Sequence, residues 1–263
     1  MASSSSRGET FHEFFEQWLV GQNEHLEELV SALAERERLF HGRLFINEEE
    51  LDATILRPTI ARALDHYRHY YRVKQRWASD HVTSMFKPPW TSSLEGTLMW
   101  IGGWRPSTAI QLLYSKLGIQ LDSRIHQILR GRAIGDLGDI NMPQLTQVNI
   151  LQTGIMSEEM DINEEFMMVS VTDPKTVKLS HTVSNAMRQG GQVHGGRVEA
   201  ALRPKEERMA EVLRRADGLR MRTLEQLVGA LTPRQGVFFL IAAAELHLRV
   251  HEWGKGIDAR DHN

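Results

Sequence analysis

Apolar residues recur at helical spacing along most of the chain, with Glu, Gln, Lys and Arg filling the opposite faces. Stripes with this period cover residues 11–33, 51–77, 145–169, 204–227 and the segment from 232 onward. Alternation of the kind that marks β-strands is weak throughout. The pattern therefore predicts an all-α protein, built as a bundle of long antiparallel helices with short connecting helices.

Helix starts are marked by a short polar residue followed three positions later by Glu or Gln, which is the spacing of a capping box. These pairs are Thr10 with Glu13, Asn47 with Glu50, Ser92 with Glu95, Asn141 with Gln144 and Thr232 with Gln235. Two prolines add boundaries. Pro58 is expected to kink a helix or to mark its beginning, and Pro204 is expected to open the helix that follows it.

The same pattern gives the domain organisation. The serine-rich residues 1–9 are expected to be a disordered tail, and residues 10–254 a single helical domain. Within that domain the periodicity fades over about 172–203, where QGGQVHGGR indicates a flexible insert. Residues 255–263 are expected to form a C-terminal tail.

Composition excludes several classes of protein. The 263 residues contain no cysteine, so disulfides, thiolate zinc sites, iron–sulfur clusters and cysteine nucleophiles are ruled out. The net charge is −3, with 31 basic and 34 acidic residues, and it lacks the basic excess usual in nucleic-acid binders. MASSSSRGET is not a signal peptide, and no run of about 18 apolar residues predicts a membrane span. We therefore expect an intracellular protein that does not enter a membrane.

His247 and His251 are the strongest candidate for chemistry. Their spacing of four puts both imidazoles on one face of a helix, in AELHLRVHEWGK. A zinc protease is excluded because Leu248 stands where the H-E-x-x-H motif needs its glutamate. A structural zinc would need two more ligands, so no metal is expected apart from haem iron. Haem ligation and packing in a helical core remain as alternatives, and one helix can hardly supply ligands to opposite faces of a haem.

Two further groups of residues each allow a functional and a structural interpretation. Phe11, Phe14, Phe15 and Trp18 place four aromatics within about two helical turns, so they are either anchors for a partner or part of the bundle core. In WIGGW, the glycines and the following arginine could grip an anion, but a tight corner between helices with both tryptophans buried is favoured. The basic residues around Lys74 are interpreted as a solvated helix face.

Three segments carry a resemblance to a known family. PPWTSSLEGTLMWIGGWRPS, DLGDINMPQLTQVNIL and LTPRQGVFFLIAAAELHLRVHEWG together resemble the plant Delay of Germination family. The same domain forms the C-terminal part of TGA-type bZIP transcription factors. The resemblance runs from about Phe11 to about Gly254. It implies a regulator of seed dormancy, germination and abscisic-acid signalling, without enzymatic activity, in the nucleus and cytoplasm.

The resemblance also implies partners and a cofactor. It points to clade A type 2C protein phosphatases docking at the aromatic N-terminal segment, and to haem at His247 and His251. The alternative is a transcription-associated adaptor that pairs with other proteins carrying this domain, and homodimerisation is left open. Autonomous sequence-specific DNA binding is not expected, because Arg7 is followed at once by an acidic, aromatic helix instead of a basic region and leucine heptads.

Overall fold

The computed structural model describes residues 10–42, 47–117, 140–171 and 195–261. Its long helices are α1 (Phe11–Gly42), α3 (Arg57–Phe86), α7 (Met142–Val171), α9 (Gly195–Ala230) and α10 (Pro233–Asp261). The short ones are α2 (Glu48–Leu51), the π-helix η1 (Asp52–Leu56), α4 (Ser93–Leu98) and α5 (Ser107–Lys116). Within these ranges no strand occurs beyond an isolated bridge between Trp100 and Gly103. The prediction of an all-α fold is confirmed.

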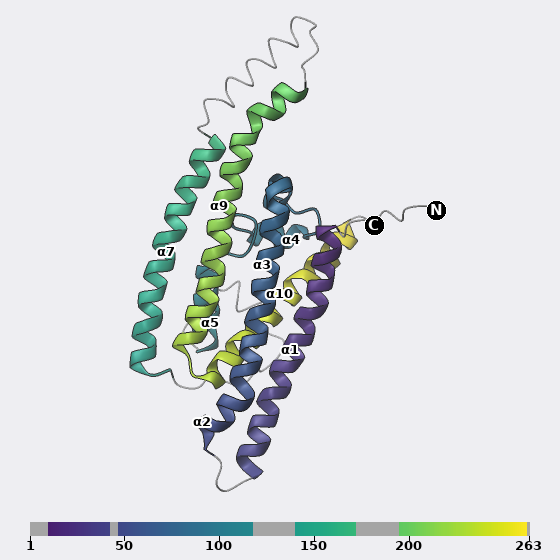
Figure 1. The fold of residues 1–263 in the computed structure, drawn as a ribbon. Coiled ribbons are helices and arrows are strands. Elements are labelled where there is room, and N and C mark those ends of the chain that lie inside the picture. The colour runs from purple at the N-terminus through teal and green to yellow at the C-terminus, as the bar shows by residue number, and fades with distance from the viewer. Residues whose placement is uncertain (1–9, 43–46, 118–139, 172–194, 262–263) are drawn as a thin grey trace, which may run out of the picture.

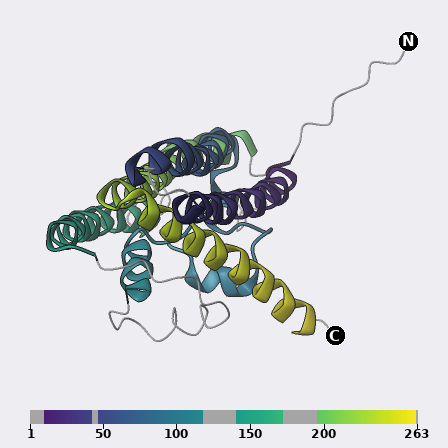
Figure 2. The same cartoon turned by 90° about the horizontal axis from the view of Figure 1, so that it is seen from below.

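Four long helices lie side by side in the order α7, α9, α3, α1, and α10 runs obliquely past α9, α3 and α1 (Figure 1). Helix α10 packs against α1, α3 and α9, and it also contacts the short helices α4 and α5. The view from below shows α7 at one edge of the bundle and α10 running across it (Figure 2). No helix in the described ranges is long and apolar enough to cross a membrane. Among the described elements, α10 thus connects α1, α3, α4, α5 and α9, whereas α7 is held by α9 and α5.

The helix starts follow the capping pairs with one exception. Thr10, Ser92, Asn141 and Thr232 each exchange hydrogen bonds with the residue three positions on. Asn47 instead accepts from the backbone N–H of Glu49 at 3.1 Å. Pro58 stands in the first turn of α3, directly after η1. A proline cannot donate the i→i−4 bond, and the helix has π geometry in the turn directly before it.

The structure extends two helices beyond the predicted limits. Helix α9 begins at Gly195, so Pro204 lies inside it instead of opening it. Helix α10 continues to Asp261, so residues 255–261 of the expected tail are helical. Residues 1–9 and 172–194 lie outside the described part of the chain. The domain limits as a whole stay a prediction.

A buried charged network fixes the WIGGW corner, and here the interpretation of Lys74 was wrong. Lys74 is 2% exposed, and its ammonium donates to Asp217 at 2.8 Å and to the carbonyl of Gly102 at 2.7 Å. Arg220, fully buried, also pairs with Asp217. Gly102 has φ of +70°, and a Cβ there would lie 2.7 Å from a backbone carbonyl of α3. The structure therefore bears out the tight corner, although Trp104 is only partly buried.

Candidate functional site

His251 lies where α10 meets the start of α4. The residue is 6% exposed, and its Nδ1 lies 3.0 and 3.1 Å from the two carboxylate oxygens of Glu95. Glu95 also accepts from the Ser92 backbone N–H at 2.8 Å and from the Ser92 hydroxyl at 2.6 Å. The capping box of α4 thus serves a second purpose, because its carboxylate fixes the imidazole of a distant helix.

Gly254 permits this close approach of α4 to α10. A Cβ at Gly254 would lie 1.9 Å from the Ser92 hydroxyl oxygen, so any larger residue would push the two helices apart. The N–H of Ser93 also donates to the Asp258 carboxylate at 3.0 Å. The sequence marks Ser92 and Glu95 as a helix cap, but nothing in its spacing marks them as partners of His251. The pairing was therefore missed at the level of sequence.

The electrostatics of the pair favour an ionised carboxylate. Burial on its own raises the pKa of Glu95, but hydrogen bonds from His251 and Ser92 outweigh it and lower that pKa to about 2. Because an ionised carboxylate can only accept, Nδ1 of His251 carries the proton of this bond. The other ring nitrogen, Nε2, is buried and has no hydrogen-bond partner among the described residues.

His247 has a different environment, one turn earlier on α10. Its ring lies 5.2 Å from the ring of Trp18, which in turn stacks on His66 at 4.8 Å. Burial lowers the pKa of His247 to about 4 and that of His66 to about 4. These imidazoles are therefore neutral near pH 7 and pack as aromatic groups. The packing alternative accounts for His247, whereas Nε2 of His251, like Nε2 of His66, is buried without a hydrogen-bond partner among the described residues.

The aromatic residues of α1 lie mostly inside the bundle. Phe11, Phe15 and Trp18 are only 3%, 3% and 4% exposed. They pack against α3 and α10, with the Phe15 ring 5.7 Å from that of His251. Phe14 is partly exposed at the edge of this cluster. In the folded state, Phe14 is thus the member of the set that an incoming partner could contact without displacing α1.

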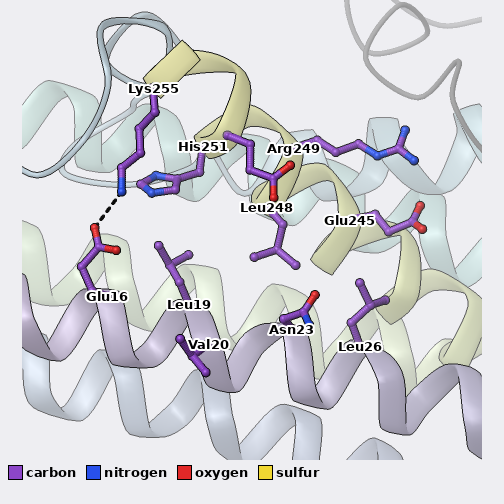
Figure 3. A pocket seen from close by; sticks show the side chains of 11 residues that line it. Glu16, Leu19, Val20, Asn23, Leu26, Glu245, Leu248, Arg249, His251 and Lys255 are labelled. Atoms are coloured by element: carbon purple, nitrogen blue, oxygen red, sulfur yellow. Dashed lines mark hydrogen bonds and ion pairs between the residues drawn. The ribbon is translucent and has the colours of Figure 1, made fainter. Parts of the chain in front are cut away.

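A groove of 680 Å³ runs between α1 and α10 beside this cluster (Figure 3). Apolar residues Leu19, Val20, Leu26 and Leu248 form part of its lining. Its charged members include an ion pair of 2.9 Å between Lys255 and Glu16. His251 borders the groove and His247 does not. His251 is thus buried at the border of the groove, whereas His247 is partly exposed but does not line it.

These observations fit His251, and not His247, as the residue that would hold a haem iron. A ligating histidine typically donates its second ring N–H to a carboxylate, which is the arrangement of His251 with Glu95. Its Nε2 is the nitrogen left without a partner in the described residues. His247 projects from the same face one turn away and packs on Trp18.

A metal site and a hydrolytic triad receive less support from the structure. No group of three or more His, Asp or Glu side chains in the described ranges is placed to hold a metal ion. Ser92, Glu95 and His251 are in contact, but the carboxylate stands in the middle of the three. In a hydrolytic triad the histidine must lie between serine and carboxylate in order to take the serine proton. The trio therefore forms a structural connection between helices.

Comparison with known proteins shows which family the chain resembles. A family model described as "DOG1: Seed dormancy control" matches residues 25–115. Protein DOG1-like 3 of Arabidopsis thaliana is 29% identical over 248 residues, which cover 91% of this chain and 82% of that protein. Protein RESPONSE TO ABA AND SALT 1 of the same plant is 25% identical over 256 residues, covering 95% and 96%.

A second group of relatives is longer than this chain. The tobacco protein TGA-2.1, a TGACG-sequence-specific DNA-binding protein, is 26% identical over 238 residues. These cover 90% of this chain but 44% of TGA-2.1. The chain thus matches DOG1-like proteins over most of their length and less than half of that TGA factor, and its resemblance to the Delay of Germination family is confirmed.

Proposed function

We propose that the chain is a non-enzymatic regulator of seed dormancy and germination in abscisic-acid signalling, acting in the nucleus and cytoplasm. The observation that carries this proposal is the match to DOG1-like proteins over 91% of the chain, together with the dormancy description of the matching family model. A relative named for its response to abscisic acid and salt supports the hormone context.

Germination on abscisic acid tests this role. Seeds in which the gene is disrupted are expected to germinate at hormone concentrations that arrest the parental line, and the intact gene should restore arrest. Equal germination of disrupted and parental seeds, fresh and after storage, would contradict the proposal.

The regulator is proposed to act by binding type 2C protein phosphatases of the abscisic-acid pathway through the start of α1. Phe14 supports this placement, because it is the partly exposed member of the aromatic set and needs no rearrangement to be reached. Its ring lies 5.5 Å from Phe11 and 5.7 Å from His69, so it is held at a fixed place on the surface. Rigid aromatic residues of this kind serve as interface anchors.

A pair of α1 variants tests this contact with a purified phosphatase of that class. Phe14→Ala is expected to weaken binding at least about tenfold, the effect of losing one aromatic anchor. Val30→Ala removes an apolar side chain that is 49% exposed on the same helix and should leave binding unchanged. If the parent and Phe14→Ala bind the phosphatase with equal affinity, the phosphatase does not dock at Phe14.

Haem is proposed as a ligand of His251. When bound, the group would supply a redox- and gas-sensitive iron centre, and His251 would provide one imidazole held in place by Glu95. His247 is proposed to shape the apolar surroundings through its contact with Trp18. The support for this assignment is the buried Nε2 of His251, which has no partner in the described residues.

Haem titration followed by absorption separates the two histidines. His251→Ala should abolish the shifted Soret band, whereas His247→Ala should reduce it only in part. Circular dichroism of each variant serves as the control for folding. A band that is unchanged in the double variant would overturn haem ligation by this helix.

A transcription-associated adaptor is the second candidate, and the match to TGA-2.1 over 90% of this chain favours it. Such an adaptor would pair with proteins that carry the same domain. Co-purification with a TGA factor, with no binding to the phosphatase, would favour this candidate over the first.

A further inference from the structure

Helix α7 carries apolar side chains on two opposite faces. Val148, Ile155, Ile162 and Val169, spaced seven residues apart, are buried against the bundle at 0–4% exposure. The other face is exposed, and its apolar members are Met142 (71%), Ile150 (67%), Met156 (53%), Met160 (58%), Met167 (57%) and Met168 (60%). A helix that is apolar on both sides is normally covered on both sides. Here the second side faces outward.

The position of α7 leaves that face accessible. The helix packs on α9 and α5 and lies at the outer edge of the bundle in both views (Figures 1 and 2). Met156, Met160 and Met167 are four and seven residues apart, which aligns them along one side of the helix. Such a line of side chains matches the spacing by which one helix packs on another. Methionine is also flexible and polarisable, so it adapts to differently shaped apolar partners.

The charge on α7 specifies what kind of helix would fit. Its sequence contains five acidic residues and no lysine, arginine or histidine. Three of these acids are paired with arginines outside α7: Glu158 with Arg222, Glu159 with Arg105, and Glu165 with Arg215. Asp161 and Glu164 are exposed beside the methionines, with no ion-pair partner in the described residues. The face is therefore apolar, with negative charge that no ion pair within the described ranges compensates.

We propose that the face formed by Met156, Met160, Met167, Asp161 and Glu164 binds a basic amphipathic helix of a partner protein. The apolar side of that helix would cover the methionines, and its lysine or arginine side chains would meet the two free carboxylates. A second copy of this chain fits less well, because pairing α7 with another α7 would bring like charges together. This surface is separate from α1 and α10, where phosphatase and haem are proposed to bind.

A designed peptide tests the proposal without either of those ligands. The probe is a labelled peptide of about 18 residues, or about five helical turns, with leucine along one face and lysine elsewhere. It is titrated with the full chain, and binding is followed by fluorescence anisotropy. Two control peptides are used. The first has the same composition in scrambled order, and the second keeps the order but has glutamate in place of lysine. The parent chain should bind the first peptide at least about tenfold more tightly than either control.

Variants then locate the binding surface. Met156→Gln, Met160→Gln and Met167→Gln together should weaken binding at least about tenfold. Asp161→Asn with Glu164→Gln should weaken it several-fold and reduce its dependence on salt. Val20→Gln with Val30→Gln changes exposed apolar residues of α1, at 62% and 49%, and should have no effect.

Two results would overturn the proposal. One is binding that is the same in the parent and the triple methionine variant, since the peptide would then bind elsewhere. The other is a dimer of the parent chain, seen by sedimentation, that the triple variant dissolves, since a second copy would then occupy the face. The charge variant preserves every methionine contact, so it decides the question even if the triple variant folds poorly.

Discussion

Glu95 and His251 are 156 residues apart in the sequence, yet the carboxylate of one lies 3.0 Å from Nδ1 of the other. The pair joins α4 to α10 at a buried position next to the aromatic cluster of α1. One carboxylate thereby satisfies a helix start and orients an imidazole. This double use makes Glu95 more important for stability than an ordinary capping residue.

Glu95→Ala is expected to destabilise the fold because it leaves the buried Ser92 N–H and the Nδ1–H of His251 without acceptors. Each unsatisfied group costs roughly 1–3 kcal/mol. Glu13→Ala is the matched control, since Glu13 closes the same capping box with Thr10 at an exposed helix start. Chemical denaturation should show a large loss in the free energy of unfolding for Glu95→Ala and a small one for Glu13→Ala. Equal losses would mean that the contact with His251 adds nothing beyond the cap.

Gly254→Ala tests the close approach of α4 and α10. The new Cβ would lie 1.9 Å from the Ser92 hydroxyl, and overpacking of this kind costs about 1–3 kcal/mol. Gly256→Ala, two residues further along α10, meets no atom within 4 Å and should stabilise the helix by about 0.5–1 kcal/mol. The melting temperature, followed by circular dichroism, should therefore fall for Gly254→Ala and rise for Gly256→Ala. A neutral Gly254→Ala would show that α4 can shift without cost.

Features that depend on local spacing could be predicted from the sequence, whereas those that depend on distant contacts could not. The apolar period and the capping pairs identify the long helices and most of their starts. The pairing of His251 with Glu95 depends on how α4 folds back onto α10, which no local pattern records. The same is true of Lys74, whose sequence neighbours suggest a solvated face although its partner Asp217 lies on α9. Burial was likewise ambiguous for the α1 aromatics, because an anchor and a core residue have the same spacing.

Asp217→Asn should be among the most damaging single changes to the fold. Asp217 accepts from Lys74 at 2.8 Å and from Arg220 at 2.5 Å, and all three residues are at most 2% exposed. Removing its charge leaves two buried cations uncompensated, at a cost of about 3–5 kcal/mol.

Asp65→Asn removes the carboxylate of an exposed pair with Arg68 and should cost less than about 1 kcal/mol. Urea denaturation of the two variants gives the comparison. If Asp217→Asn is as stable as Asp65→Asn, water must reach the WIGGW corner and replace the lost charge.

Stability should fall as the pH falls from about 6.5 to 4, because the fold holds the partly buried His66 and His247 in the neutral form. Burial lowers the pKa of each to about 4, while the ordinary value in an unfolded chain is 6.5. Between these values the unfolded chain binds protons that the folded chain does not, so protonation favours unfolding. Nearby charges act on the same groups: Glu95 and His251 on His247, and His25 and His69 on His66.

Urea denaturation at a series of pH values measures this slope, and His247→Gln should make it shallower, since a glutamine does not titrate. His41→Gln is the matched control, because His41 is 75% exposed and should leave the slope unchanged. Glu95 affects stability in a lower range of pH. Its lowered pKa of about 2 means that its stabilising contribution is complete above about pH 4.5 and is lost only as the pH falls towards 2. A slope between pH 6.5 and 4 that is the same in the parent and in His247→Gln would show that His247 can be protonated without cost. Its ring would then have to reach solvent, contrary to its packing against Trp18.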